Sequence, residues 1–156
     1  MSAAPLTDPS EAVVEVQSDL FGSIAVPGKR IFDFSSGLVG FPDCRRFALL
    51  PGKPGVYWLQ SLEHPALTFL LADPFIWVDG FELDLDIPPV GDRPTIESEV
   101  AVLCIVTLPR SGEAPATINL QGPLVLYFAD RAGRQLVLPQ SSWGVRHPVD
   151  LSRARG

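Results

Sequence analysis

The stretch that decides the fold is E-V-A-V-L-C-I-V-T-L, residues 99–108. Nearly all of its residues are β-branched or apolar, which is typical of a strand buried on both faces. It is far shorter than the roughly 20 apolar residues that a membrane-spanning helix needs. The sequence therefore predicts a buried strand here, and no apolar stretch of the chain predicts a membrane segment.

Shorter segments with strand character lie on both sides of this stretch. Val14 and Val16 alternate with Glu15 and Gln17, the period of two expected of a half-buried strand. Further strands are predicted at 24–26, 31–34, 47–50, 56–60, 67–71, 117–120, 124–128 and 134–138, and residues 75–78 and 81–85 are aromatic or alternating. With 16 prolines and 13 glycines the chain is punctuated by turns. We therefore expect an all-β, mostly antiparallel domain, a small closed or semi-closed β-barrel.

Several local features refine this expectation. Pro123 would break a central ladder, so a bulge or an edge is predicted at residues 121–123. Gly133 is predicted to turn the chain into the strand at 134–138. At most short helical turns are expected, and residues 94–98 are the candidate.

The 156 residues fit a single domain. Residues 1–12 are small and polar and are expected to be a flexible N-terminal extension, with neither the basic nor the apolar region of a signal peptide. Residues 13–148 form the predicted β domain, and residues 149–156 a flexible C-terminal tail. Two cysteines far apart, Cys44 and Cys104, are expected to be buried free thiols in a reducing cytoplasm.

The net charge of −6 bears on the kind of partner. Binding to a phosphate backbone needs a basic stripe, so direct nucleic-acid binding is disfavoured. An acidic surface suits a basic patch on another protein, because complementary charge raises the association rate and the specificity.

Catalytic and metal-binding constellations are not predicted. Ser141, Ser142, His147 and Asp150 crowd into a short segment without a strained nucleophile elbow, so solvated loop residues are the preferred interpretation. Asp84 and Asp86, even with His64, are interpreted as an acidic surface stripe rather than a metal site. The pair Gly37 and Gly40 has no lysine and does not open a helix, so it predicts no phosphate loop. We expect no enzyme activity, no metal and no cofactor.

Aromatic residues beside acidic ones are the best candidates for a protein interface. Trp77 and Phe81 are predicted to be exposed anchors, because aromatic side chains dominate interface energetics. The interface hypothesis comprises Phe75, Trp77, Asp79, Phe81 and Glu82.

Several short motifs, in order along residues 14–147, resemble the flagellar assembly factor family FliW. They are I-F-D-F-S-S-G-L-V-G-F at 31–41, W-L-Q-S at 58–61, the D-P-F and F-E-L segments at 73–75 and 81–83, T-I-N-L-Q-G-P-L at 117–124, and Q-L-V-L at 135–138. The chain departs from the family pattern at Val39, Asp79, Gly80, Gly122 and Trp143.

The motif residues are interpreted mainly as structural. They are Gly37, Leu38, Gly40, Phe41, Gln60, Ser61, Asp73, Pro74, Asn119, Leu120 and Pro123. The glycines and Pro123 are expected to shape loops, and Asn119 to cap a turn through its side-chain amide rather than to contact a partner.

The resemblance implies a non-enzymatic, cytoplasmic regulator. Proteins of this family bind flagellin, and they bind and antagonise the RNA-binding translational regulator CsrA, so that flagellin synthesis follows flagellin export. The alternative is a β-barrel that binds a small ligand in its mouth, which would need convergent polar groups in an apolar pocket.

Overall fold

The computed structural model describes residues 12–83, 100–110, 115–138 and 143–152. The strands in this part of the chain are β1 (Val13–Ser18), β2 (Gly22–Pro27), β3 (Ile31–Asp33), β4 (Arg46–Pro51), β5 (Val56–Ser61), β6 (Thr68–Ala72), β7 (Val100–Thr107), β8 (Ala116–Ile118), β9 (Leu124–Tyr127), β10 (Ala132–Gln135) and β11 (His147–Val149). A short α-helix, α1 (Pro74–Trp77), and a 3₁₀ turn, η1 (Gly28–Arg30), complete the described elements.

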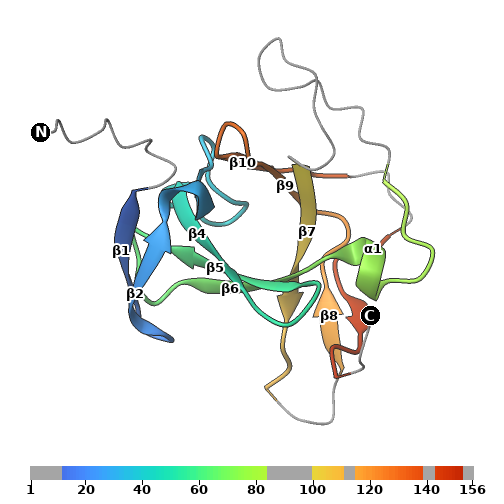
Figure 1. Ribbon diagram of the computed structural model, residues 1–156. Helices are drawn as coiled ribbons and strands as arrows, with labels where there is room; N and C mark the ends of the chain where they lie inside the picture. Colours follow the sequence, from blue (N-terminus) through green and yellow to red (C-terminus); the bar gives the residue numbers. More distant parts are fainter. Residues whose placement is uncertain (1–11, 84–99, 111–114, 139–142, 153–156) are drawn as a thin grey trace, which may run out of the picture.

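Strand β7 closes the sheet into a barrel. One edge of β7 pairs with β6, and the other pairs with β9 through Val100–Leu103 and with β8 through Val106–Thr107. The ring therefore runs β7-β6-β5-β4-β3-β10-β9 and back to β7. Its pairings are antiparallel except for the single parallel pair Ala132 and Asp33. The prediction of an all-β, mostly antiparallel barrel is confirmed (Figure 1).

Large apolar side chains fill the inside of the barrel. On β4 the alternation sends Phe47 and Leu49 inward, whereas Ala48 packs outward. Phe34 lies edge-on to Phe47, with ring centroids 5.4 Å apart. Each fully buried side chain of this size stabilises the fold by about 1.5–3 kcal/mol.

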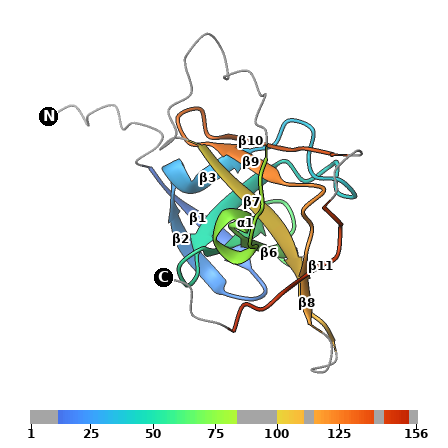
Figure 2. The same ribbon diagram turned by 90° about the vertical axis from the view of Figure 1, so that its right-hand side faces the viewer.

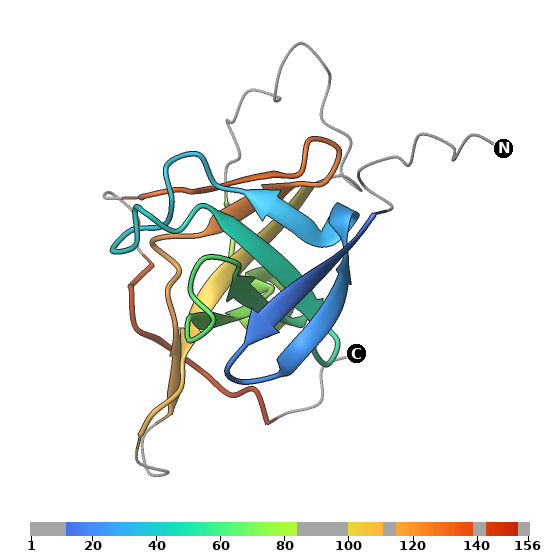
Figure 3. The same cartoon turned by 90° about the vertical axis from the view of Figure 1, so that its left-hand side faces the viewer.

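Two further layers cover the outside of the barrel. The β1–β2 hairpin packs Val16 and Val26 against Ile31 and Ala48, and it lies across the face seen in Figure 3. On the opposite side α1, β8 and β11 bury a second outer core (Figure 2). Strand β7 therefore lies between two cores, and the burial on both faces that the apolar pattern of residues 99–108 predicted is observed.

Two details differ from the expectations, and a third cannot be compared. Residues 74–77 are helical, because Asp73 and Pro74 start a helix there. Gly133 lies within β10 rather than at a turn; the chain reverses at Phe128–Arg131 instead, where Arg131 adopts φ 52°. The segment 94–98, expected to form a helical turn, lies outside the described residues.

The C-terminal part of the described chain returns to the barrel. Strand β11 pairs with β8, and its last residue, Val149, is buried, although the sequence placed the start of the tail at that position. Among the described residues, no helix is both long enough and apolar enough to span a bilayer.

Candidate partner-binding surface

The exposed residues of α1 and of the turn after it form a surface that we call the α1 patch: Phe75, Ile76, Asp79 and Glu82. Phe75 is 51% exposed and Ile76 is 40% exposed, and both acidic residues are exposed. The helix projects from the side of the barrel opposite the β1–β2 hairpin (Figures 1 and 2). The patch therefore combines apolar area with negative charge at an accessible position.

Asp73 and Pro74 set the start of the helix. The Asp73 carboxylate accepts a 2.9 Å hydrogen bond from the backbone N–H of Phe75, so Asp73 is the N-cap. Pro74 occupies the first turn, where its missing N–H has no cost. These two motif residues thereby fix the direction in which Phe75 and Ile76 point.

Trp77 anchors the helix to the barrel and is not an exposed anchor, so this part of the interface hypothesis is wrong. It is 4% exposed, and its indole N–H donates a 3.1 Å hydrogen bond to the carbonyl of Gly55. The Lys53 ammonium lies 5.0 Å from the centre of its ring and also donates to the carbonyl of Leu151. A satisfied indole in a packed site is supporting structure for the patch.

Phe81 is buried as well, with 6% of its surface exposed, and its predicted role as an exposed anchor is also wrong. Its ring packs between Phe75 and Trp143, at centroid distances of 5.2 Å and 5.4 Å. Trp143 in turn lies 5.6 Å from the His147 ring. This aromatic row supports Phe75 from below and links α1 to β11.

A cleft of about 350 Å³ adjoins the patch. It is bounded by Trp77–Asp79 on one side and by Pro115 and residues 147–150 on the other. Asp84 and Asp86, the rest of the acidic segment, lie outside the described residues. The patch therefore has a recess beside Asp79.

Burial governs the titration of the groups beneath α1. Desolvation raises the pKa of Asp73, although the backbone N–H groups of Phe75 and Ile76 act in the opposite direction. Desolvation, with a smaller contribution from the Asp73 charge, raises the pKa of Cys104 to about 12. Cys104 is therefore a protonated thiol at neutral pH and a poor nucleophile.

The remaining motif residues hold turns elsewhere. Gly37 and Gly40 have φ of 66° and 89°, and between them Leu38 forms a β-bridge with Phe41. A Cβ on Gly37 would lie 2.6 Å from the carbonyl oxygen of Phe41, so this position requires glycine. Leu38 is buried and Phe41 is exposed.

Gln60 and Ser61 organise the connection between β5 and β6. The buried Gln60 amide donates to the carbonyls of Ser61 and Pro65 and accepts from the Thr68 hydroxyl. The Ser61 hydroxyl accepts from the N–H groups of Glu63 and His64. Both polar side chains are buried because the turn satisfies them.

Asn119 and Pro123 shape the bulge between β8 and β9. The Asn119 carbonyl oxygen accepts from the N–H groups of Gln121 and Gly122, at 3.1 Å and 3.0 Å, which is the turn-capping role expected of it. Leu120 is fully buried in the outer core. The predicted bulge at residues 121–123 is confirmed, because residues 119–123 are inserted between the two segments that pair with β7.

The other chemical candidates are described only in part. Among the described residues, no three His, Cys, Asp or Glu side chains lie close enough to hold a metal ion. Ser141 and Ser142 lie outside the described residues, and the Asp150 carboxylate accepts from Ser152. Cys44 and Cys104 are buried free thiols.

Sequence reasoning missed Ile76 and placed two buried residues at the surface. The signal that would have found Ile76 is the Asp73-Pro74 start, since a helix beginning there turns consecutive aromatic and apolar residues to different sides. Read as a strand, the same residues alternate and give the wrong set of exposed positions.

Comparisons with known proteins show which family the chain belongs to. The model of the family described as FliW protein matches residues 15–149. The flagellar assembly factor FliW of Natranaerobius thermophilus is 35% identical, with 92% of this chain and 99% of that protein covered. FliW of Treponema pallidum is 34% identical over 87% of this chain and 91% of its own length. A crystal structure of the flagellar assembly factor FliW matches with a TM-score of 0.73 and 29% identity, covering 86% of this chain and 96% of that one. The chain belongs to the FliW family.

Proposed function

We propose that this chain is a cytoplasmic, non-enzymatic flagellar assembly factor that binds flagellin and that binds and antagonises the translational regulator CsrA. The observation that carries the proposal is the family match over residues 15–149, which includes nearly all described elements. Relatives that align over more than nine-tenths of their own length are named flagellar assembly factors.

The α1 patch is the surface proposed to contact a partner. Phe75 and Ile76 supply accessible apolar area, and the aromatic row beneath Phe75 limits its motion. Little side-chain entropy is lost when a side chain that is already restrained becomes part of an interface. Asp79 and Glu82 border this area and favour a partner with basic residues.

The proposed mechanism is exchange of partners. While flagellin accumulates, it occupies the limited pool of this protein and leaves CsrA free to repress translation of the flagellin message. Export of flagellin releases the protein, which then captures CsrA. The net charge of −6 suits the capture of a basic RNA-binding protein.

The ligand-binding barrel finds less support. The barrel interior is occupied by apolar side chains, with Phe32, Phe34, Phe47, Leu59 and Leu126 fully buried in it. A ligand in the barrel would have to displace this core.

Titration of the purified chain tests the proposal. Flagellin and CsrA from the same genome are each added to the labelled chain in calorimetry or anisotropy experiments, and the two are then added together. Saturable binding of each, with flagellin lowering the amount of bound CsrA, is the expected result. The absence of binding to either protein would refute the proposal.

Placement of the contact on the α1 patch is tested separately. Phe75→Ala is expected to weaken partner binding at least about tenfold, because it removes an exposed aromatic side chain from the centre of the patch. The matched control is Phe21→Ala, which removes a partly exposed phenylalanine from the β1–β2 turn on the other side of the molecule. Equal effects of the two substitutions would move the contact away from α1.

A further inference from the structure

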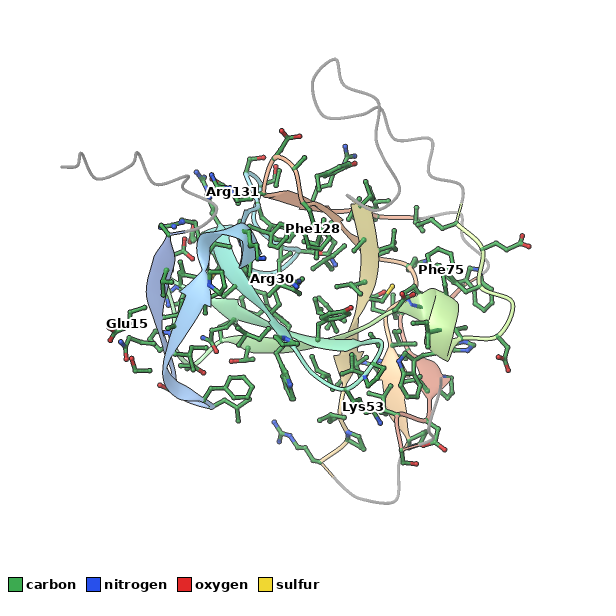
Figure 4. All side chains as sticks on the ribbon, in the orientation of Figure 1. Glu15, Arg30, Lys53, Phe75, Phe128 and Arg131 are labelled. Atoms are coloured by element: carbon green, nitrogen blue, oxygen red, sulfur yellow. The ribbon has the colours of Figure 1, made fainter. Side chains whose placement is uncertain are left out.

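The outer edge of strand β1 is unpaired in the described part of the chain. The β1–β2 hairpin forms a sheet of its own, and β1 pairs with β2 alone. Figure 3 shows the hairpin lying across the outside of the barrel, and Figure 4 shows Glu15 on the outer side of β1, far from Phe75. This edge is therefore distinct from the α1 patch.

The register of the hairpin fixes which backbone groups point to the open edge. Gly28 N–H donates to the carbonyl of Ala12, and Val13 lies opposite Pro27. In an antiparallel ladder, hydrogen-bonded and non-bonded pairs alternate, so Val13 and Pro27 form a non-bonded pair. By the same alternation, the backbone N–H and C=O groups of Val13, Glu15 and Gln17 point away from β2, toward the open edge.

Pro27 agrees with this alternation of hydrogen-bonded and non-bonded pairs, and it makes the two edges of the hairpin different. Pro27 has no N–H, so it fits only a position whose N–H would point away from β1. The outward positions of β2 are therefore Ser23, Ala25 and Pro27, one of which offers no donor. The β1 edge offers a donor and an acceptor at every outward position and is the better template for another strand.

The side chains along this edge give it a chemical preference. Val13, Glu15 and Gln17 are all exposed, and Val13 is 67% exposed. The Glu15 carboxylate is held by the Ser23 hydroxyl at 2.9 Å and by the Gln17 amide at 3.1 Å, both on Oε1. A residue directly across from Glu15 on an added strand would have its Cβ about 4.5–5.5 Å away.

A second copy of this chain is a poor occupant of the edge. Twofold pairing of β1 with itself through all three outward residues sets Glu15 against Glu15 and Val13 against Gln17. Like charges directly opposite each other destabilise a strand pair, and the net charge of −6 on each copy adds repulsion.

We propose that the β1 edge binds an extended segment of another protein, which adds as a strand and places lysine or arginine opposite Glu15 and an apolar residue opposite Val13. The backbone groups of Val13, Glu15 and Gln17 supply the hydrogen bonds, and the two side chains supply the selectivity. The proposal does not depend on the α1 patch or on the identity of its partner.

The test uses the full-length chain and the capped peptide Thr-Lys-Thr-Val-Thr, in which lysine and valine are two residues apart and therefore lie on the same face of an added strand, followed by NMR or calorimetry. The control peptide Thr-Lys-Val-Thr-Thr has the same composition and charge but places lysine and valine on opposite faces, and it is expected to bind at least about tenfold more weakly. Glu15→Lys is expected to reverse the charge preference, so that this variant binds Thr-Glu-Thr-Val-Thr instead.

Proline substitutions separate strand addition from charge attraction. Val13→Pro removes an outward donor of β1 and leaves the ladder to β2 intact, so we expect it to weaken peptide binding about tenfold. Ala25→Pro makes the same change at the outer edge of β2 and is expected to leave binding unchanged. Equal binding of the same-face peptide and its control, equal effects of the two prolines, or self-association of the wild-type chain that Val13→Pro abolishes would each overturn the proposal.

Discussion

The indole N–H of Trp77 donates its hydrogen bond to the carbonyl of Gly55, a residue at φ 77° in the turn that precedes β5. A Cβ on Gly55 would lie 2.8 Å from Nε1 of that indole and 3.2 Å from the Ile76 side chain. Glycine is therefore required at this position both by the backbone of its own turn and by the packing of helix α1.

Gly55→Ala is predicted to destabilise the chain by about 2–4 kcal/mol, because alanine is strained at positive φ and its methyl group would displace Trp77. Urea denaturation measures the loss, and tryptophan fluorescence reports the displacement. The matched control is Gly22→Ala, since Gly22 has φ 78° but open space around it. A loss of stability no larger than that of Gly22→Ala would show that the packing around Trp77 tolerates the methyl group.

Asp73→Asn is predicted to change how stability depends on pH. The folded state raises the pKa of Asp73 above 3.8, so the folded carboxyl holds its proton more tightly than the unfolded one. The stability contributed by this group is present below pH 3.8 and is lost as the pH rises through the folded pKa. Asparagine caps the helix equally well without a charge to desolvate.

Relative to wild type, Asp73→Asn should therefore gain stability as the pH rises from below 3.8 toward neutrality. Denaturation curves of the two proteins over that range measure the difference. Asp73→Ala, which loses the cap, is expected to cost about 1 kcal/mol at neutral pH. A constant difference between the asparagine variant and wild type would contradict the effect of burial.

Gly133→Ala is predicted to destabilise the barrel by about 1–3 kcal/mol through overpacking. A Cβ at this position would lie 2.4 Å from the ring of Phe34. The double variant with Phe34→Leu, measured in a double-mutant cycle, is expected to recover part of the loss because the ring is gone. If the stability losses of the two single variants add strictly, the side chains at positions 34 and 133 are not in contact.

Neither thiol of the native chain is predicted to react with a thiol reagent at mildly alkaline pH. Cys44 and Cys104 are both buried, and the pKa of Cys104 is raised to about 12. Absorbance after addition of Ellman's reagent measures the reaction, and both cysteines should become reactive once denaturant is added. Rapid labelling without denaturant would show that the cores open locally.

The strand content was predictable because its signals are local. The apolar run at 99–108 and the alternation of Val14 and Val16 mark strands wherever the rest of the chain lies. The bulge before Leu124 was predictable for the same reason, since Pro123 has no N–H to give to a ladder.

The sequence-based predictions were wrong where the same residue type can have either of two structural roles. Gly133 suggested a turn, but glycine is needed there because the ring of Phe34, the residue after the neighbouring strand β3, packs against it, a contact that no local pattern reports. Trp77 and Phe81 lie beside acidic residues and suggested exposure, yet α1 turns them toward Gly55 and Trp143. Sequence patterns found the segment that carries the α1 patch, and tertiary packing decided which of its residues reach the surface.

The most direct test of the proposed regulation follows CsrA on its RNA. CsrA is bound to a fluorescent RNA that carries the leader of the flagellin message, and anisotropy is recorded while this chain and then flagellin are added. The account predicts that the chain lowers the anisotropy by removing CsrA and that flagellin restores it. An anisotropy that the chain leaves unchanged, or that flagellin fails to restore, would contradict the account.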